Sequence, residues 1–131
     1  NRLYHQPRCG RSTTEGGGAR MPVYHWTDVE ERPLNSVIRG RVVQTQQVMA
    51  CRITAPKGGI VKTHSHPFDQ ITHMLRGKFL WQIEGEEGPH IVQAGDVMVL
   101  PAGVAHGGEV IEEAEYIDIF APPNPDFQWD K

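Results

Sequence analysis

Apolar residues recur in short runs along this chain, and clusters of glycine, proline and polar residues separate them. Many of the runs alternate apolar and polar positions, which is the period of two typical of a β-strand. No stretch keeps a helical period for more than two turns. The expected strands cover residues 42–54, 60–66, 70–75, 78–84, 90–93, 97–100, 104–110 and 114–121. Strands this short and closely spaced predict an all-β antiparallel sandwich or barrel.

The length of 131 residues fits one domain with a single core. Residues 1–20 show no periodicity and contain a glycine triplet, so we expect a leader or a flexible arm there. The single domain is then 21–131, with its barrel at about 42–121. Without residues 1–20, nine basic and fifteen acidic side chains remain, so the domain is acidic. Any anionic substrate must therefore be attracted by the site rather than by the whole surface.

Composition also excludes several classes of partner. No basic patch interleaved with aromatic residues is present, so nucleic acid is not an expected partner. No apolar run is long enough to span a bilayer, and no secretory signal pattern appears. A membrane is therefore not an expected partner. Cys9 lies in the expected leader and Cys51 stands alone in the domain, which predicts a reducing, cytoplasmic location. Cys51 itself is interpreted as a core or wall residue rather than a nucleophile.

Three histidines and one glutamine have the spacing of a metal site. His64 and His66 are two residues apart on an expected strand, so their imidazoles share one face. Pro67 ends that strand, and Gln70 opens the next one. His106 follows the tight turn at 100–103. Neutral imidazole is a common metal ligand and an amide oxygen can complete the shell, so we expect these four side chains to hold one divalent ion.

The spacing of these residues resembles both motifs of the cupin family. Residues 58–77 fit G-x5-H-x-H-x3-E-x6-G with Gln70 in the Glu position, and residues 95–106 fit G-x5-P-x-G-x2-H. The final Asn of the second motif falls at Val110, where the chain departs from the pattern. The resemblance implies a double-stranded β-helix, or jelly-roll, barrel with a metal inside. Zn, Ni, Fe, Mn and Co all remain possible with nitrogen and oxygen ligands.

A narrower resemblance is to the small KdgF-type cupins of pectin and alginate breakdown. The run H-S-H-P-x-x-Q from His64 and the segment 118–123 carry it. The resemblance implies a metal on three His and one Gln, and conversion of 4,5-unsaturated monouronates into linear keto sugars. It also implies that Asp118 and Phe120 lie in the pocket. Asn124 stands where that family has an arginine, which removes a bidentate clamp for a carboxylate.

The residues themselves indicate which chemistry such a site favours. Four neutral ligands leave the full charge on a divalent ion, which favours Lewis-acid work on an oxygen over oxidation of the metal. Asp118 is the candidate general acid or base, and Tyr116, Phe120 and Trp81 are candidates for substrate binding. If Asp118 faces inward, its neighbours Ile117 and Ile119 face outward and need cover, which predicts a homodimer. The opposite orientation, with the isoleucines in the core, stays open at this point.

The function predicted from these features is metal-dependent ring opening or tautomerisation of a small, oxygen-rich, sugar-acid-like molecule. Two alternatives remain. The first is a dioxygenase that activates oxygen on the same ligands, and the second is a non-enzymatic module that binds a small molecule.

Asp69, one residue short of the motif, is expected to be a loop residue. His73, His25 and His90 are expected to lie outside the metal cavity.

Overall fold

Eight strands and two short 3-10 helices form residues 23–128, the part of the chain that this computed structural model describes. In chain order they are η1 Trp26–Asp28, β1 Arg32–Pro33, β2 Arg39–Gln44, β3 Met49–Ala55, β4 Ile60–His64, β5 Asp69–Ile83, β6 His90–Gln93, β7 Val97–Leu100, β8 His106–Ala121 and η2 Pro125–Phe127. The predicted leader at 1–20, with Cys9, lies outside the described residues. Neither short helix has the length or hydropathy to cross a membrane.

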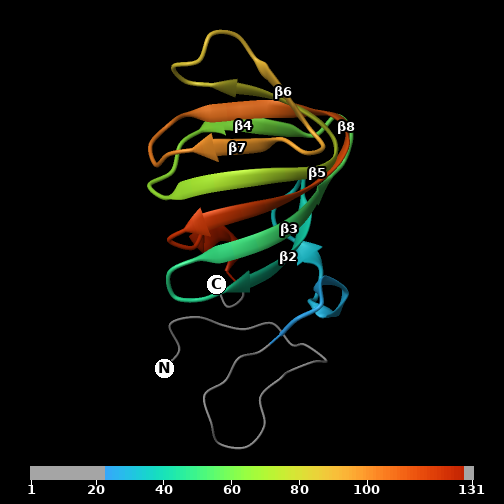
Figure 1. The fold of residues 1–131 in the computed structure, drawn as a ribbon. Helices are drawn as coiled ribbons and strands as arrows, with labels where there is room; N and C mark the ends of the chain where they lie inside the picture. The colour runs from blue at the N-terminus through green and yellow to red at the C-terminus, as the bar shows by residue number, and fades with distance from the viewer. Residues whose placement is uncertain (1–22, 129–131) are drawn as a thin grey trace, which may run out of the picture.

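The long strands β5 and β8 organise the sheet. They pair with each other antiparallel over nearly their whole length, and Figure 1 shows them running side by side and bending together. The end of β8 and the start of β5 belong to one half of the sheet, with β1, β2, β3 and β7. The start of β8 and the end of β5 belong to the other half, with β4 and β6. The predicted all-β jelly-roll architecture is confirmed.

Gly77 allows β5 to bend from one half into the other. We predicted separate strands at 70–75 and 78–84, with Gly77 between them, and that prediction is wrong, because β5 continues through this glycine. The register between β5 and β8 shifts on both sides of Gly77, which has a φ of 86°. A Cβ atom there would lie 2.1 Å from the carbonyl oxygen of Glu113. Only glycine fits this bulge, where two predicted strands merge into one.

A second correction concerns the expected strand at 42–54. The chain instead reverses between β2 and β3, which pair antiparallel. The N–H of Thr45 donates to the carbonyl of Val48 at 2.8 Å, and the Thr45 hydroxyl accepts from the N–H groups of Gln47 and Val48. This turn contains no glycine, proline, asparagine or aspartate, so the usual turn signals are absent from its sequence. The predicted strand at 42–54 is therefore two paired strands, β2 and β3.

The last part of β8 resolves the question of which face is inside. Asp118 and Phe120 are buried, whereas Ile119 between them is 38% exposed. On the paired strand β3, Met49 and Cys51 are fully buried and lie opposite Phe120 and Asp118. The alternative with the isoleucines in the core is therefore wrong, and the face that carries Asp118 points into the sandwich.

Candidate metal centre

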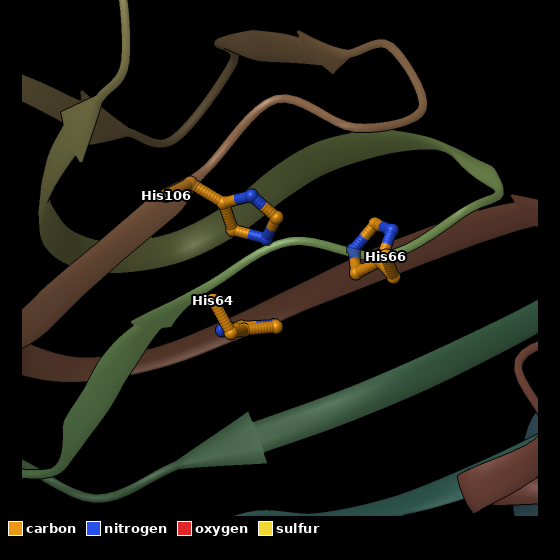
Figure 2. Close-up of side chains that lie close together, drawn as sticks. All are labelled: His64, His66 and His106. Carbon is orange, nitrogen blue, oxygen red and sulfur yellow. The ribbon is translucent and has the colours of Figure 1, made fainter.

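The three predicted histidines converge at one end of the sandwich. His64 is the last residue of β4, His66 lies in the segment that leads to β5, and His106 opens β8 opposite His64. Figure 2 shows the three rings pointing toward a shared space. One ligand nitrogen of each ring lies within 4.8 Å of those of the other two. The N–H of Gly103 donates to the carbonyl of His66 at 2.8 Å, which holds the segment with His66 against the turn that precedes His106.

Each imidazole is fixed by the same kind of hydrogen bond. Nδ1 of His64 lies 2.8 Å from the carbonyl oxygen of Lys62, and Nδ1 of His106 lies 2.9 Å from that of Val104. Nδ1 of His66 lies 3.0 Å from the carbonyl oxygen two residues ahead, on Phe68. Because a carbonyl can only accept, each Nδ1 must carry a proton and donate it. In the neutral rings each Nε2 then keeps its lone pair, which is the form that binds a metal.

Gln70 adds an oxygen to the three nitrogens. Its side-chain oxygen lies 3.1 Å from Nε2 of His66, while its amide nitrogen lies 3.0 Å from the hydroxyl of Thr72 and 3.4 Å from Oδ1 of Asp118. The amide nitrogen needs acceptors, so these two neighbours fix the orientation of the group. The carbonyl oxygen is thereby turned toward the histidines, where a metal shell needs it.

These donors fit a divalent transition metal. Two nitrogens bonded to one ion at about 2.1 Å each lie at most about 4.2 Å apart, so small ring rotations bring the cluster onto a shared centre. The backbone carbonyls that accept each Nδ1–H are the partners that metal-binding histidines normally have. The cluster of His64, His66 and His106 can therefore hold a metal ion, and Gln70 stays the predicted fourth ligand.

Asp118 lies behind Gln70 and is held by Thr72. The Thr72 hydroxyl donates to Oδ1 of Asp118 at 2.6 Å, so this oxygen receives hydrogen bonds from two neighbours. Oδ2 makes no hydrogen bond within residues 23–128. Burial raises the pKa of Asp118 to about 7, although the hydrogen bonds from Thr72 and Gln70 act in the opposite direction. The carboxyl can thus hold or release a proton near neutral pH.

Burial also shifts the pKa values of His106 and Cys51. Desolvation lowers the pKa of His106 against the raising effect of its bond to the Val104 carbonyl, and the other two imidazoles lower it further. This ring is therefore neutral at pH 7, as metal binding requires. Burial also raises the pKa of the Cys51 thiol well above its usual range, as does the nearby Asp118. That shift disfavours the thiolate, in keeping with Cys51 as a wall residue.

One cavity of about 510 Å³ connects these groups. The metal cluster, Gln70 and Asp118 line its interior, and the candidate substrate-binding residues Tyr116, Phe120 and Trp81 form part of its wall. The Phe120 ring lies 6.2 Å from the His66 ring, and the Trp81 ring 5.8 Å from the His106 ring. All four predicted ligands and all four other candidate residues thus line a single space, which is large enough for a small molecule.

The histidines predicted to lie elsewhere do so. His25, His73 and His90 do not line this cavity, and His90 instead pairs with Glu86 at 3.2 Å. Asp69 begins β5 rather than lying in a loop, and its carboxylate accepts the N–H of Ala102 at 2.9 Å. That bond ties the start of β5 to the turn before His106.

Two residues close to the candidate ligands were given no role in the sequence analysis. Thr72 follows Gln70 by two positions, so its place on the same strand face was visible, but its bond to the more distant Asp118 was not. Lys62 precedes His64 by two positions and also lines the cavity. In its case the register between β4 and β8 shifts after Val61, so simple alternation does not decide where it points.

Comparison with known proteins supports the same fold. Residues 51–120, more than half of the chain, match the cupin domain family, Cupin_2. The chain is similar to the solved structure of KdgF from Halomonas sp., with 28% sequence identity, coverage of 74% of this chain and 91% of that one, and a TM-score of 0.67. No curated protein sequence matches it significantly.

Two further solved structures resemble the chain in fold alone. An RmlC-like cupin from Shewanella frigidimarina NCIMB 400 is 24% identical, with coverage of 77% of this chain and 90% of that one and a TM-score of 0.70. Ectoine synthase from P. lautus is 11% identical, with coverage of 81% of both chains and a TM-score of 0.71. Identities this low carry no argument about activity.

Proposed function

This chain belongs to the cupin domain family, and we propose that it is a metal-dependent cupin that opens the ring of a small sugar-acid-like substrate or tautomerises it. The support is the cavity that holds a three-histidine cluster and a buried carboxyl together. The 28% identity to KdgF from Halomonas sp., and the KdgF-type run from His64 to Gln70, support the choice of substrate class.

In this proposal His64, His66, His106 and Gln70 hold one divalent ion. When bound, such an ion supplies Lewis-acid polarisation of a substrate carbonyl, hydroxyl or carboxylate oxygen. The residues supply the rest of the arrangement. The backbone carbonyls fix the imidazole rings, and Thr72 and Asp118 fix the amide of Gln70. A site held in this way keeps its ligands in place without reorganisation during the reaction.

Asp118 is the proposed proton carrier, through Oδ2. Oδ1 is engaged by Thr72 and Gln70, so Oδ2 is the oxygen left to exchange a proton with a molecule in the cavity. A pKa of about 7 lets this carboxyl both accept and donate near neutral pH. The aromatic rings of Phe120 and Tyr116, which lie on the same face of β8, exclude water around it.

The reaction needs one proton removed and one delivered. In a 4,5-unsaturated uronate the ring oxygen joins C1 to C5, and C1 carries a hydroxyl. Removal of the hydroxyl proton forms the C1 carbonyl and breaks the bond from C1 to the ring oxygen, which leaves an enolate at C5. Delivery of a proton to C4 then gives the C5 ketone. The sum is an isomerisation without any redox partner, so a single carboxyl that takes and returns a proton suffices.

The observation that carries this proposal is the contact of Asp118 with the amide of Gln70, which joins the proton carrier to the ligand set. The test follows the ultraviolet absorbance of 4,5-unsaturated galacturonate with the metal-loaded protein. We expect absorbance to be lost faster than in the spontaneous reaction, and the acceleration to disappear with a chelator. Asp118→Ala should retain the metal and lose turnover. Loss of absorbance at the spontaneous rate with wild-type protein would show the uronate proposal to be wrong.

The same preparations distinguish the two alternative functions. A dioxygenase would consume oxygen with an enediol substrate, so oxygen uptake above the background rate would replace ring opening as the activity. A binding module would bind ligands without turning over either class of substrate. The neutral ligand set of three imidazoles and the Gln70 amide favours the isomerisation over the dioxygenase, because it stabilises a divalent rather than an oxidised ion.

A further inference from the structure

Lys62 is the cation of the cavity wall. Among the residues that line this space within 23–128, it is the single lysine or arginine side chain. Its backbone carbonyl accepts the Nδ1–H of His64 at 2.8 Å, so its position is tied to the metal cluster. The register shift between Val61 and His64 makes this part of β4 irregular, and irregular strand steps commonly redirect a side chain.

The ammonium group of Lys62 has no acidic partner within the described part of the fold. Several of the other cations on the sheet have acidic partners: Arg39 with Glu31, Arg52 with Glu115, Arg76 with Glu113 and Glu115, and Lys78 with Glu112. No carboxylate within 23–128 forms such a pair with Lys62, whose side chain is exposed at the cavity. An ammonium group that faces a ligand cavity without an acidic partner is available for an anion.

The rest of the wall determines which end of a ligand carries the negative charge. Asp118 lies in the buried interior and repels an anionic group when ionised. Asn124 is neutral, and its side-chain oxygen already accepts the N–H of Asp126 at the start of η2. Asn35 lines the cavity from the loop after β1, and its oxygen accepts two backbone N–H groups, which leaves a neutral amide donor. Apart from the divalent ion proposed for the histidines, Lys62 is therefore the group of this wall that can compensate a carboxylate.

We propose that Lys62 binds the carboxylate of the substrate, while the hydroxyl or carbonyl oxygens at the other end reach the histidines and Asp118. This inference deepens the proposed function and rests on it for the class of ligand, a small hydroxylated carboxylic acid. It assigns the anion specificity to β4 rather than to the tail at Asn124. The acidic composition of the domain makes such a local cation necessary, since the surface as a whole repels anions.

The test compares binding of D-galacturonate and of its neutral methyl ester by calorimetry, with the protein as purified. Wild-type protein should bind the acid about tenfold more tightly than the ester, as expected for one charge-assisted contact. Lys62→Met should weaken binding of the acid to the level of the ester and leave the ester unchanged, and Lys62→Arg should restore the preference. Lys57→Met, which removes an exposed lysine just before β4 and outside the cavity lining, should behave as wild type.

Two results would overturn the assignment of Lys62. One is a preference for the acid that survives in Lys62→Met, and the other is the absence of any preference in the wild-type protein. Because the measurement is of binding, it is separate from turnover. A protein that fails to open the unsaturated uronate but loses its acid preference in Lys62→Met refutes the reaction and leaves the role of Lys62 intact.

Discussion

Nε2 of His66 and the side-chain oxygen of Gln70 lie 3.1 Å apart. With Nδ1–H of His66 donating to the Phe68 carbonyl, both of these atoms carry lone pairs in the neutral ring. Two acceptors at this distance repel each other unless a positive centre lies between them, either a proton on the imidazole or a metal ion. The fold thus holds two ligand atoms together in an arrangement that a bound cation stabilises.

The first prediction is that the chain binds about one divalent transition metal ion and that the histidines are required for it. His106→Ala removes the most buried ring of the cluster, so metal affinity should fall by more than about 100-fold. His73→Ala removes an exposed imidazole of β5 that does not line the cavity and should leave affinity unchanged. Metal content after dialysis, measured by mass spectrometry, checks both. Equal metal content in the two variants would contradict the site.

The second prediction concerns the orientation of Gln70. Thr72→Val removes the hydroxyl that accepts from the Gln70 amide and donates to Asp118, with little change in volume. We expect metal affinity to fall by about 10- to 100-fold, the usual effect of losing a hydrogen bond that orients a metal ligand. Thr54→Val, on the half-exposed part of β3, is the matched control. Affinity that is unchanged in Thr72→Val would mean that Asp118 alone orients the amide.

The sequence predicted which side chains come together better than it predicted the strands around them. His64 and Gln70 follow local spacing, and local spacing survives folding because strand period and turn chemistry act over a few residues. The turn at Thr45 was missed because its residues form it through a hydroxyl and ordinary backbone bonds. Gly77 was left between two predicted strands, since a glycine serves a turn and a bulge equally well, and only the partner strand distinguishes them.

The contacts of Asp118 with Thr72 and Gln70 join β8 to β5, more than forty residues apart in the chain. No local pattern reports such a pairing, and a raised pKa depends on burial that sequence does not measure. The resemblance to KdgF-type cupins indicated an inward Asp118, while alternation along β8 allowed either face. Burial of Phe120 and exposure of Ile119 decided between them.

The third prediction is a pH dependence of stability in the metal-free protein. The pKa of Asp118 rises from 3.8 to about 7 on folding, so the folded state retains a proton that the unfolded chain has lost. The stabilisation is fully present below about pH 4 and is lost as the pH rises to about 7. Across this window the free energy of unfolding should fall by about 1.4 kcal/mol per pH unit from this group.

Asp118→Asn is the control for that measurement, because it cannot titrate and keeps an oxygen to accept from Thr72. Urea denaturation with a chelator, at pH values from 4 to 8, gives the difference between the two proteins. The stability of wild type relative to the variant should decline across the window and level off above it. A difference that stays constant with pH would contradict the raised pKa of Asp118.

The fourth prediction tests the bulge in β5. Gly77→Ala places a Cβ 2.1 Å from the Glu113 carbonyl oxygen at a φ of 86° and should lower the free energy of unfolding by at least about 3 kcal/mol. Gly85→Ala is the matched control, since Gly85 has a φ of 87° but nothing within 4 Å of a Cβ. It should cost only the conformational penalty, about 1–2 kcal/mol. Equal losses in denaturant titrations would show that the close approach at Gly77 does not matter.

The fifth prediction is a homodimer, which we propose forms through the outer face of the sheet. Val99, Ile71 and Ile119 occupy one row across β7, β5 and β8 and are 64%, 41% and 38% exposed. Exposed apolar residues in register across three strands form a patch of the kind that partners cover. Nearby Arg52 already pairs with Glu115 in the same chain at 2.7 Å. When two copies of this face pack together, each therefore contacts apolar residues and a neutralised ion pair of the other copy, rather than charges of its own sign.

A two-fold arrangement makes the dimer sensitive to one charge, because each substitution appears twice in the interface. Val99→Asp should convert the dimer into a monomer without loss of the metal site, since Val99 points away from the cavity. Val48→Asp is the matched control. It changes another exposed valine, which is 40% exposed and lies in the turn before β3, and it should leave the dimer intact. Sedimentation equilibrium at micromolar concentration measures the mass of each. A wild-type monomer, or a dimer that persists in Val99→Asp, would remove this face as the interface.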